Sequence, residues 1–276
     1  MSLNTVMVRC AAVGLTALVL LVGASTAGAS ASVRPTPASA AGGRHHPDPL
    51  RPFGRLNHDV VSSSNWSGYA VESTGKFTDV RASWIQPGVI CGRRSSYSSF
   101  WAGLDGYSSD SVEQIGSDSD CAGGAPVYYA WYELYPAGSV ELSATRYPVR
   151  AGNRLSAEVA ASGSTFTLTL KSSAGWTYTT TRTVSGLARS SAEIIAESPE
   201  ICGYFCRVAP LSDFGSVSFT GAVAAVNGGA DRPLGSFTFD NGPHEIVAVT
   251  GGGQVKAQPT ALSASGSAFG VSWRHS

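Results

Sequence analysis

From about residue 60 onward, hydrophobic and polar residues alternate in short runs and show no helical period. In the run 165–170, for example, Phe166, Leu168 and Leu170 alternate with threonines. Similar runs, rich in Val, Thr, Phe, Tyr and Trp, are separated by Gly, Ser, Asn, Asp or Pro, which is typical of strands joined by turns. The pattern predicts strands within 77–87, 127–136, 154–162, 164–172, 176–184, 214–220, 235–240, 244–251 and 268–274.

Each of these strands is expected to bury one face and to leave the other accessible. Many short strands of this kind build a β-sandwich or a barrel, and no internal repeat indicates a solenoid or a propeller. Residues 60–276 are long enough for one such domain. Because sandwiches of this length are often lectin-like, we predict an all-β, concanavalin-like β-sandwich. An extended ligand would lie on the concave face of one sheet.

The stretch SAEIIAESPE, residues 191–200, is predicted to be a strand with two carboxylates on one face. Alternate residues of an extended chain share a face, so Glu193, Ile195 and Glu197 point one way. Ile194 and Ala196 point the other way. A solvated outer face would explain the two acids, and so would a cleft that needs an acid for its chemistry.

The N-terminal 59 residues differ in composition from the rest. In 1–31, Arg9 precedes an apolar run and small residues follow, which indicates a secretory signal peptide with two possible cleavage points. The apolar run is too short to span a membrane, so we expect no membrane association after signal removal. Residues 32–59 are rich in Pro, Ala, Arg and His, which is typical of a linker or a pro-segment. We therefore expect a secreted protein.

The net charge of the domain argues against one class of binding partner. Five of the 19 basic residues and one of the 19 acidic residues precede residue 56, which leaves 14 basic against 18 acidic residues. A net charge of about −4 without a basic cluster argues against a nucleic-acid partner. The small number of charges also permits an acidic working environment, because few ion pairs are lost in acid. We expect a monomer.

Four cysteines remain after the signal segment: Cys91, Cys121, Cys202 and Cys206. An even number in an exported chain suggests disulfides. Three pairings are possible, and proximity favours Cys91 with Cys121 and Cys202 with Cys206. Metal binding is the rival interpretation, but no Cys-x-x-Cys pair or histidine-rich set supports it. We therefore expect two disulfides and no metal.

Several familiar catalytic motifs are absent from the sequence. It contains no His-Glu-x-x-His, no Gly-x-Ser-x-Gly, no Asp-Thr-Gly or Asp-Ser-Gly, and no phosphate-binding glycine loop. Past the Pro-rich stretch the histidines are His58, His244 and His275, and the first and last lie at the ends of the domain. A Ser-His-Asp triad would therefore depend on His244 alone.

Five ordered stretches carry a more specific signal. They are SSNWSGYAV from Ser63, FWAGLDGYSSDSVEQIGSD from Phe100, YYAWYELYP from Tyr128, AEIIAE from Ala192 and PLSDFGSVSFT from Pro210. Together they resemble the glutamic peptidases, or eqolisins, a family of secreted acid endopeptidases. The resemblance covers about residues 63–220 and implies a sandwich of two curved antiparallel sheets.

The resemblance also implies the roles of individual residues. The family's catalytic Gln falls on Gln114, and its catalytic Glu falls on Glu197, the second acidic residue of its stretch, so that Glu193 is left as a neighbour. Positions that line the substrate in the family match Trp66, Trp101, Asp105 and Glu133. Two positions depart from the pattern of many members: Tyr129 stands in place of Asp, and Ile194 in place of Trp.

These residue types suit the hydrolysis of an amide bond. The reaction needs a base for water, a donor for the developing oxyanion and an acid for the leaving nitrogen. A carboxylate such as Glu197 can serve as base and then return the proton, whereas the amide of Gln114 can orient water and donate an N–H. A second carboxylate in place of Gln114 would repel the oxyanion. No cofactor is required, and the expected substrates are polypeptides.

Two other functions fit parts of the sequence. A carbohydrate-binding or glycoside-cleaving lectin-like domain would use exposed tryptophans and paired carboxyls. Glu193 and Glu197 would be about 13 Å apart at their backbones on one strand, which is too far for an obvious pair, although Glu133 on another strand could supply one. An inactive relative that only binds peptides is the other alternative, but the retention of both Gln114 and Glu197 argues against it.

Overall fold

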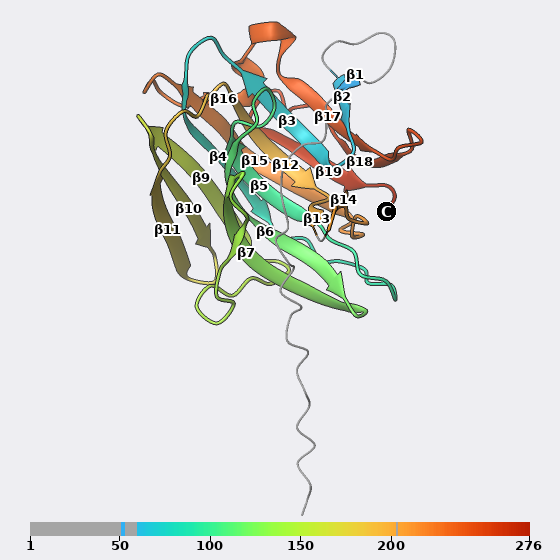
Figure 1. Cartoon of the computed structure of the whole chain (residues 1–276). Coiled ribbons are helices and arrows are strands. Elements are labelled where there is room, and N and C mark those ends of the chain that lie inside the picture. The colour runs from blue at the N-terminus through green and yellow to red at the C-terminus, as the bar shows by residue number, and fades with distance from the viewer. Residues whose placement is uncertain (1–50, 53–59, 203) are drawn as a thin grey trace, which may run out of the picture. The chain divides into compact units, whose positions relative to one another are not determined.

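The computed structural model describes residues 51–52, 60–202 and 204–276. The predicted signal peptide, 1–31, and all but two residues of the predicted linker or pro-segment, 32–59, lie outside these ranges. Within the described ranges no helix has the length and apolarity needed to cross a membrane. The described chain consists almost entirely of β-strands and turns (Figure 1).

Five long strands and one short strand form the layer that we call the site layer. They are β3 (Trp66–Glu72), β5 (Ser99–Leu104), β6 (Val112–Ala122), β7 (Ala125–Tyr135), β8 (Val140–Glu141) and β12 (Ser191–Glu197). Their spatial order is β8, β7, β6, β5, β12, β3, and every neighbouring pair is antiparallel. The chain thus inserts β12 between two strands that precede it by about a hundred residues.

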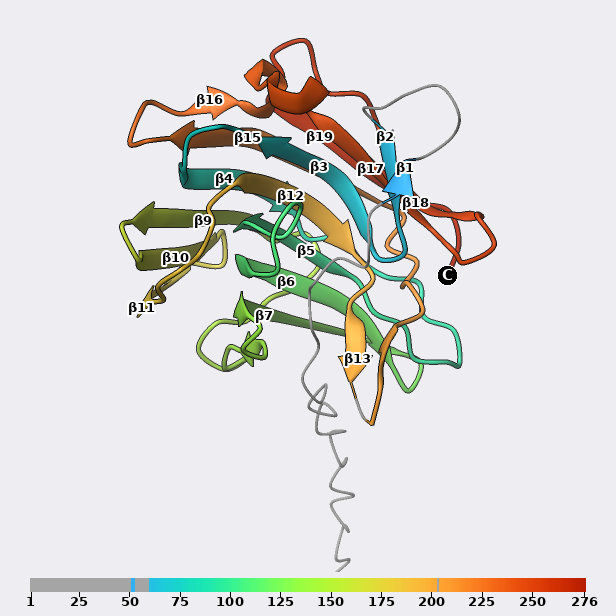
Figure 2. The same cartoon turned by 45° about the horizontal axis from the view of Figure 1, so that its top comes forward.

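Six further strands form a second layer, which we call the support layer. They are β4 (Phe77–Ile85), β9 (Arg154–Ser162), β10 (Thr165–Ser172), β11 (Trp176–Thr183), β15 (Ser216–Val226) and β19 (Ala268–Trp273). Their order is β11, β10, β9, β4, β15, β19, again antiparallel throughout. Figure 2 shows this layer curving behind the site layer.

Two strands join the layers at one edge. Strand β17 (His244–Val249) pairs with β3, and β18 (Val255–Pro259) connects β17 to β19, so the hydrogen-bonded sheet is continuous through both layers. A parallel pair forms between β17 and β2 (Val60–Ser63). The remaining elements are short: β1 (Arg51–Pro52), β13 (Glu200–Cys202), β14 (Cys206–Val208), β16 (Arg232–Pro233), and the 3₁₀ turns η1 (Leu234–Ser236) and η2 (Phe239–Asn241).

The main hydrophobic core lies between the two layers. Ile194 of β12 and Phe100 of β5 belong to the same buried cluster as Trp84 of β4 and Phe219 of β15. The rings of Trp84 and Phe219 meet edge to face, with centroids 5.8 Å apart. Burial of each large apolar side chain contributes about 1.5 to 3 kcal/mol to stability. The all-β sandwich predicted from alternation is confirmed.

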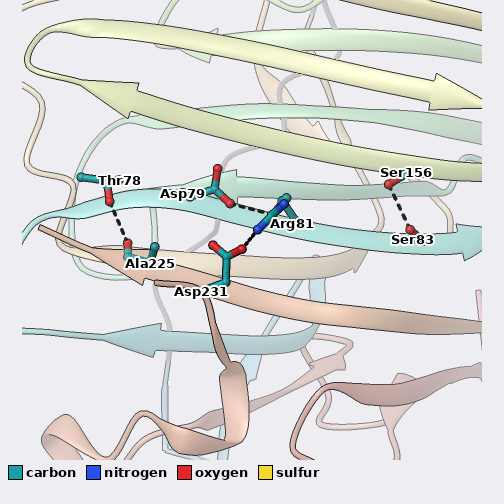
Figure 3. Close-up of polar contacts among 7 residues, drawn as sticks. All are labelled: Thr78, Asp79, Arg81, Ser83, Ser156, Ala225 and Asp231. Atoms are coloured by element: carbon teal, nitrogen blue, oxygen red, sulfur yellow. Dashed lines mark hydrogen bonds and ion pairs between the residues drawn. The ribbon is translucent and has the colours of Figure 1, made fainter. Parts of the chain in front are cut away.

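The outer face of the support layer is polar, as the alternation predicts. On β4, Asp79, Arg81 and Ser83 point away from the core, and Arg81 forms ion pairs with Asp79 and Asp231 (Figure 3). The hydroxyl of Ser83 donates to Ser156 Oγ on β9 at 3.0 Å. Burial raises the pKa of Asp79 to about 7, against the opposing effect of the Arg81 charge. Of these contacts, the hydrogen bond between Ser83 and Ser156 connects the neighbouring strands β4 and β9.

The site layer departs from the predicted pattern of one buried and one accessible face. Every residue of β5 and of β12 is buried, because the face turned away from the support layer carries a second apolar cluster. The members of this cluster are Val61, Trp66, Ala70, Trp101, Val112, Trp131, Ile195 and Ile246. Alternation in sequence separates two faces, but it does not show that both of them are covered.

The predicted strand at 235–240 is wrong. This segment forms η1 and η2, and only Phe237, at 4% exposure, is buried deeply between them. Gly235 lies against Gly266, and Asp240 has a positive φ of 47°, which a strand does not allow. The alternation of Phe and polar residues therefore reflects a single buried anchor in a turn.

Candidate active site

The candidate site is the face of the site layer that is turned away from the core. Side chains of β12 divide as predicted: Ile194 enters the main core, whereas Ile195 enters the second apolar cluster beside Glu193 and Glu197. Cross-strand neighbours share a face, so Trp101, Gln114 and Trp131 of β5, β6 and β7 lie on the same side. The sheet therefore gathers several predicted site residues on one surface.

Glu197 ends β12 and is completely buried. Its Oε2 accepts a hydrogen bond of 2.7 Å from Trp101 Nε1, and its Oε1 accepts one of 3.2 Å from Asn65 Nδ2. Burial raises the pKa of the Glu197 carboxyl well above its usual range, while the donors of Trp101, Trp66 and Asn65 oppose that rise. Both oxygens of this carboxyl are thus held in place by neutral N–H donors.

Asn65 is itself fixed by the local chain. Its Oδ1 accepts from Ser63 Oγ at 2.9 Å, and its carbonyl accepts from the backbone N–H of Ser198 at 2.8 Å. Ser63 Oγ in turn accepts from the backbone N–H of Trp66 at 3.0 Å. The turn between β2 and β3 is therefore bonded directly to the residue that follows Glu197.

Gln114 lies on β6, opposite Gly103 of β5 and Glu133 of β7. Its Nε2 donates to Glu133 Oε2 at 3.0 Å, and both side chains are fully buried. Gly103 is also opposite Glu193 of β12, so Gln114 and Glu193 occupy the same row of the sheet. Tyr107 donates its backbone N–H to Glu193 Oε1 at 3.3 Å, and burial raises the pKa of Glu193 well above its usual range.

Gln114, Gly103 and Glu193 are aligned across β6, β5 and β12, and Glu197 lies four residues after Glu193 on β12. The indole of Trp101 lies between Gln114 and Glu197. Its Nε1 contacts Glu197. A Cβ placed on Gly103 would lie 3.1 Å from Trp101 Cζ3 and 3.0 Å from Gln114 Cβ, so the far edge of the indole reaches the row of Gln114. A Cβ on Gly116 would lie 2.6 Å from Trp101 Cβ and would also meet the Phe100 carbonyl. Two glycines therefore let the indole lie against the sheet between the predicted catalytic residues.

Comparison of the sequence with known protein families identifies the family of this chain. Residues 64–272 match the Peptidase A4 family, which is about three quarters of the chain. The chain belongs to the Peptidase A4 family. It is 29% identical over 237 residues to Aspergillopepsin-2 of Aspergillus niger, and the alignment covers 74% of this chain and 81% of that protein.

Solved structures of Peptidase A4 relatives have the same fold. Scytalido-glutamic peptidase with a transition state analog inhibitor gives a TM-score of 0.65 at 25% identity, covering 76% of this chain and 98% of that one. Aspergilloglutamic peptidase from Aspergillus niger gives a TM-score of 0.54 at 27% identity, covering 65% and 99%. The chain is thus a glutamic-type endopeptidase, and proteins are its substrates.

The other residues expected to line the substrate have different surroundings in this Peptidase A4 domain. Trp66 packs edge to face on Trp101, with centroids 4.9 Å apart. Asp105, in a turn with a φ of 66°, accepts the backbone N–H groups of Arg189 at 2.7 Å and Ser190 at 2.8 Å. Asp105 therefore holds the loop that leads into β12.

An acidic group beside Trp131 was missed by the sequence reasoning. Trp131 Nε1 donates to Asp118 Oδ1 at 2.5 Å, and the hydroxyl of Tyr129 contacts Asp118 Oδ2 at 2.7 Å and Asp120 Oδ2 at 3.0 Å. Burial and the Asp118 charge raise the pKa of Asp120 well above its usual range. The signal in the sequence was Tyr129, which stands where many family members have Asp. Its hydroxyl lies between the carboxyls of Asp118 and Asp120.

The cysteine prediction is confirmed. Disulfides join Cys91 to Cys121 and Cys202 to Cys206. The first ties the loop before β5 to the end of β6, and the second closes the hairpin of β13 and β14 directly after the Glu197 strand.

The family assignment favours a peptidase over the carbohydrate alternative. The tryptophans of this face are buried, since Trp66 and Trp101 are fully buried and Trp131 is 1% exposed.

Proposed function

We propose that this protein is an exported endopeptidase that cleaves extended polypeptides at acidic pH with Glu197 and Gln114 as its catalytic pair. The observation that carries the proposal is the environment of Glu197, a buried carboxyl whose two oxygens are held by Trp101 and Asn65. Gln114 supports it from the same face of the sheet. Residues 1–31 would direct export, and 32–59 would be an inhibitory pro-segment that is removed, an expectation that rests on composition alone.

The proposed reaction needs only protein groups and water. The ionised carboxylate of Glu197 takes a proton from water as the water oxygen attacks the scissile carbonyl carbon. The Nε2–H of Gln114 donates to the oxyanion that forms. Glu197 then gives the proton to the leaving nitrogen, which breaks the carbon–nitrogen bond and restores the carboxylate. Glu133, which accepts from Gln114 Nε2, would keep the amide group correctly oriented.

Buried carboxyls outside the catalytic pair favour folding of the domain at acidic pH. Glu193 and Asp120, which take no part in the proposed reaction, have pKa values raised mainly by burial, so their neutral forms persist above the usual range. The raised pKa of Glu197 acts in the opposite direction, because the proposed reaction begins with its carboxylate. Neutral acids are the form that a low-dielectric interior tolerates. The fold is therefore suited to acid.

The test uses three variants at the proposed pair. Denatured casein or haemoglobin is incubated with each protein from about pH 2 to pH 7. We expect Glu197→Gln to lose activity by about a thousandfold or more, and Gln114→Ala by about a hundredfold to a thousandfold. Gln114→Glu should fail as well, because the second carboxylate repels the oxyanion.

Glu158→Gln is the matched control, since Glu158 lies on β9 of the support layer and its substitution removes the same charge. It should retain wild-type activity. Equal activity of wild type and Glu197→Gln would overturn the proposed pair, and the pH of greatest activity tests the acidic range separately.

A further inference from the structure

A cavity of about 910 Å³ lies beside the end of β12, outside the surface that carries Gln114. Two residues of its wall lie next to residues that adjoin Glu197 in the sequence or contact it. Ala209 lines the cavity, and its carbonyl accepts from Ser198 Oγ at 2.5 Å. Ser64 also lines it, directly before Asn65. A polypeptide that extends past Glu197 along this end of the sheet would therefore enter the cavity.

The cavity is cationic, although the domain as a whole is acidic. The charged side chains that line it are Arg93, Arg94, Lys256 and Asp213. Among the described residues no ion pair involves either arginine, and both are exposed. Lys256 is 5% exposed and donates from Nζ to the Ser64 carbonyl at 3.1 Å. Among the side chains that line the cavity, three cations therefore stand against one carboxylate.

The loop that carries the two arginines is held at both ends. The disulfide from Cys91 to Cys121 anchors its start. At its end, Ser96 and Cys121 exchange backbone hydrogen bonds of 3.1 and 2.8 Å, and Tyr97 donates its N–H to the Pro210 carbonyl at 2.9 Å. Residues 92–95 are thus short and tethered, so little conformational freedom is lost when a ligand binds them.

The chemistry of the two arginines suits a carboxylate ligand. Arginine forks bind carboxylates with two parallel hydrogen bonds, which is geometrically more selective than a single charge.

We propose that this cavity is a subsite for a carboxylate of the polypeptide substrate, bound by Arg93 and Arg94 above the buried Lys256. The inference rests on the proposed function only in taking the substrate to be a polypeptide that reaches Glu197. The carboxylate comes either from an acidic side chain or from the C-terminus of the substrate. Binding there would fix the direction in which the substrate lies across the sheet.

Direct binding tests the subsite without depending on catalysis. Short peptides with blocked termini, carrying one Glu or Gln at successive positions, are titrated into the Glu197→Gln protein at about pH 5, where a free Glu is ionised. A second set replaces the C-terminal amide by a free acid. We expect one Glu position, or the free acid, to bind about tenfold more tightly than its neutral counterpart.

Substitution of the arginines identifies the subsite. Arg93→Gln with Arg94→Gln should remove that tenfold preference and leave binding of the neutral peptide unchanged. The matched control is Arg150→Gln with Lys171→Gln, two exposed cations away from the cavity, which should keep the preference. High salt should reduce the preference in the parent protein, because exposed charges are screened.

The outcomes separate the two proposals. Equal binding of Glu, Gln, acid and amide peptides would overturn the subsite, and so would a preference that survives loss of both arginines. If the wild-type protein cleaves nothing but the preference is present and depends on the arginines, the catalytic pair is refuted and the subsite stands. Which peptide set shows the preference distinguishes a side-chain carboxylate from a terminal one.

Discussion

At the residue scale, the two carboxylates of β12 differ in what surrounds them. Glu193 accepts a backbone N–H from Tyr107, whereas Glu197 accepts side-chain donors from Trp101 and Asn65. Periodicity predicted that both acids share a face, and the motif resemblance singled out Glu197. The surroundings of Glu197 could not be predicted, because Asn65 is 132 positions away in the sequence and Ser63 fixes it only after folding.

The Trp101 donor gives a prediction about pH dependence. Trp101→Phe keeps most of the buried ring but removes the N–H that lowers the pKa of Glu197. The pKa of Glu197 should therefore rise further. Because the proposed reaction begins with ionised Glu197, the acidic limb of the pH–activity profile should move to higher pH, and activity at low pH should fall by about tenfold to a hundredfold.

Trp84→Phe is the control for this change. Trp84 is equally buried but lies in the main core, where its Nε1 contacts Gln86 and Ser117. It should reduce stability without moving the limb. A pH profile of kcat/KM that is the same for Trp101→Phe and the wild type would contradict the role assigned to the indole.

At the element scale, most strands follow from alternation and turn residues. Strand β9 begins and ends where predicted, and the ends of β4, β10 and β11 differ from the prediction by at most two residues. The position of β12 between β3 and β5 could not be predicted, since its partners are set by packing between distant segments. Nor did alternation distinguish the turns of η1 and η2 from a strand, because one buried Phe satisfies both patterns.

Close packing of β5 on β6 gives a prediction about stability. Gly116→Ala would drive a methyl group into the Phe100 carbonyl and Trp101 Cβ, both on the neighbouring strand. Because backbone must move to relieve this contact, we expect a loss of about 2 to 4 kcal/mol in the free energy of unfolding. Urea denaturation measures it.

Gly138→Ala is the control, since a Cβ there meets nothing within 4 Å. It should change stability by less than about 1 kcal/mol. Equal effects of the two substitutions would show that the indole of Trp101 does not depend on a glycine at position 116.

At the scale of the whole molecule, buried carboxyls connect the fold to its pH range. Burial raises the pKa of Glu113 to about 9, helped by the nearby Asp105 charge. Glu193 and Glu197 shift in the same direction. The low content of charged residues indicated only that the protein can work in an acidic environment. The structure adds that neutral pH is unfavourable, because these acids must then ionise inside the protein or stay protonated at a cost.

The stability of the domain should therefore increase as pH falls from about 8 to about 4. Over this window the folded chain keeps protons that the unfolded chain, with an ordinary Glu pKa near 4.3, releases, so the free energy of unfolding decreases as pH rises.

Glu113→Gln removes one such group and should raise stability at pH 8 by on the order of 2 kcal/mol while changing it little at pH 4. Asp110→Asn, at an exposed carboxyl, should leave the slope as it is. Thermal unfolding across pH measures both variants against the wild type. A wild-type slope of the opposite sign would refute this account, whereas an unchanged slope in Glu113→Gln would assign the effect to the acids of the site face.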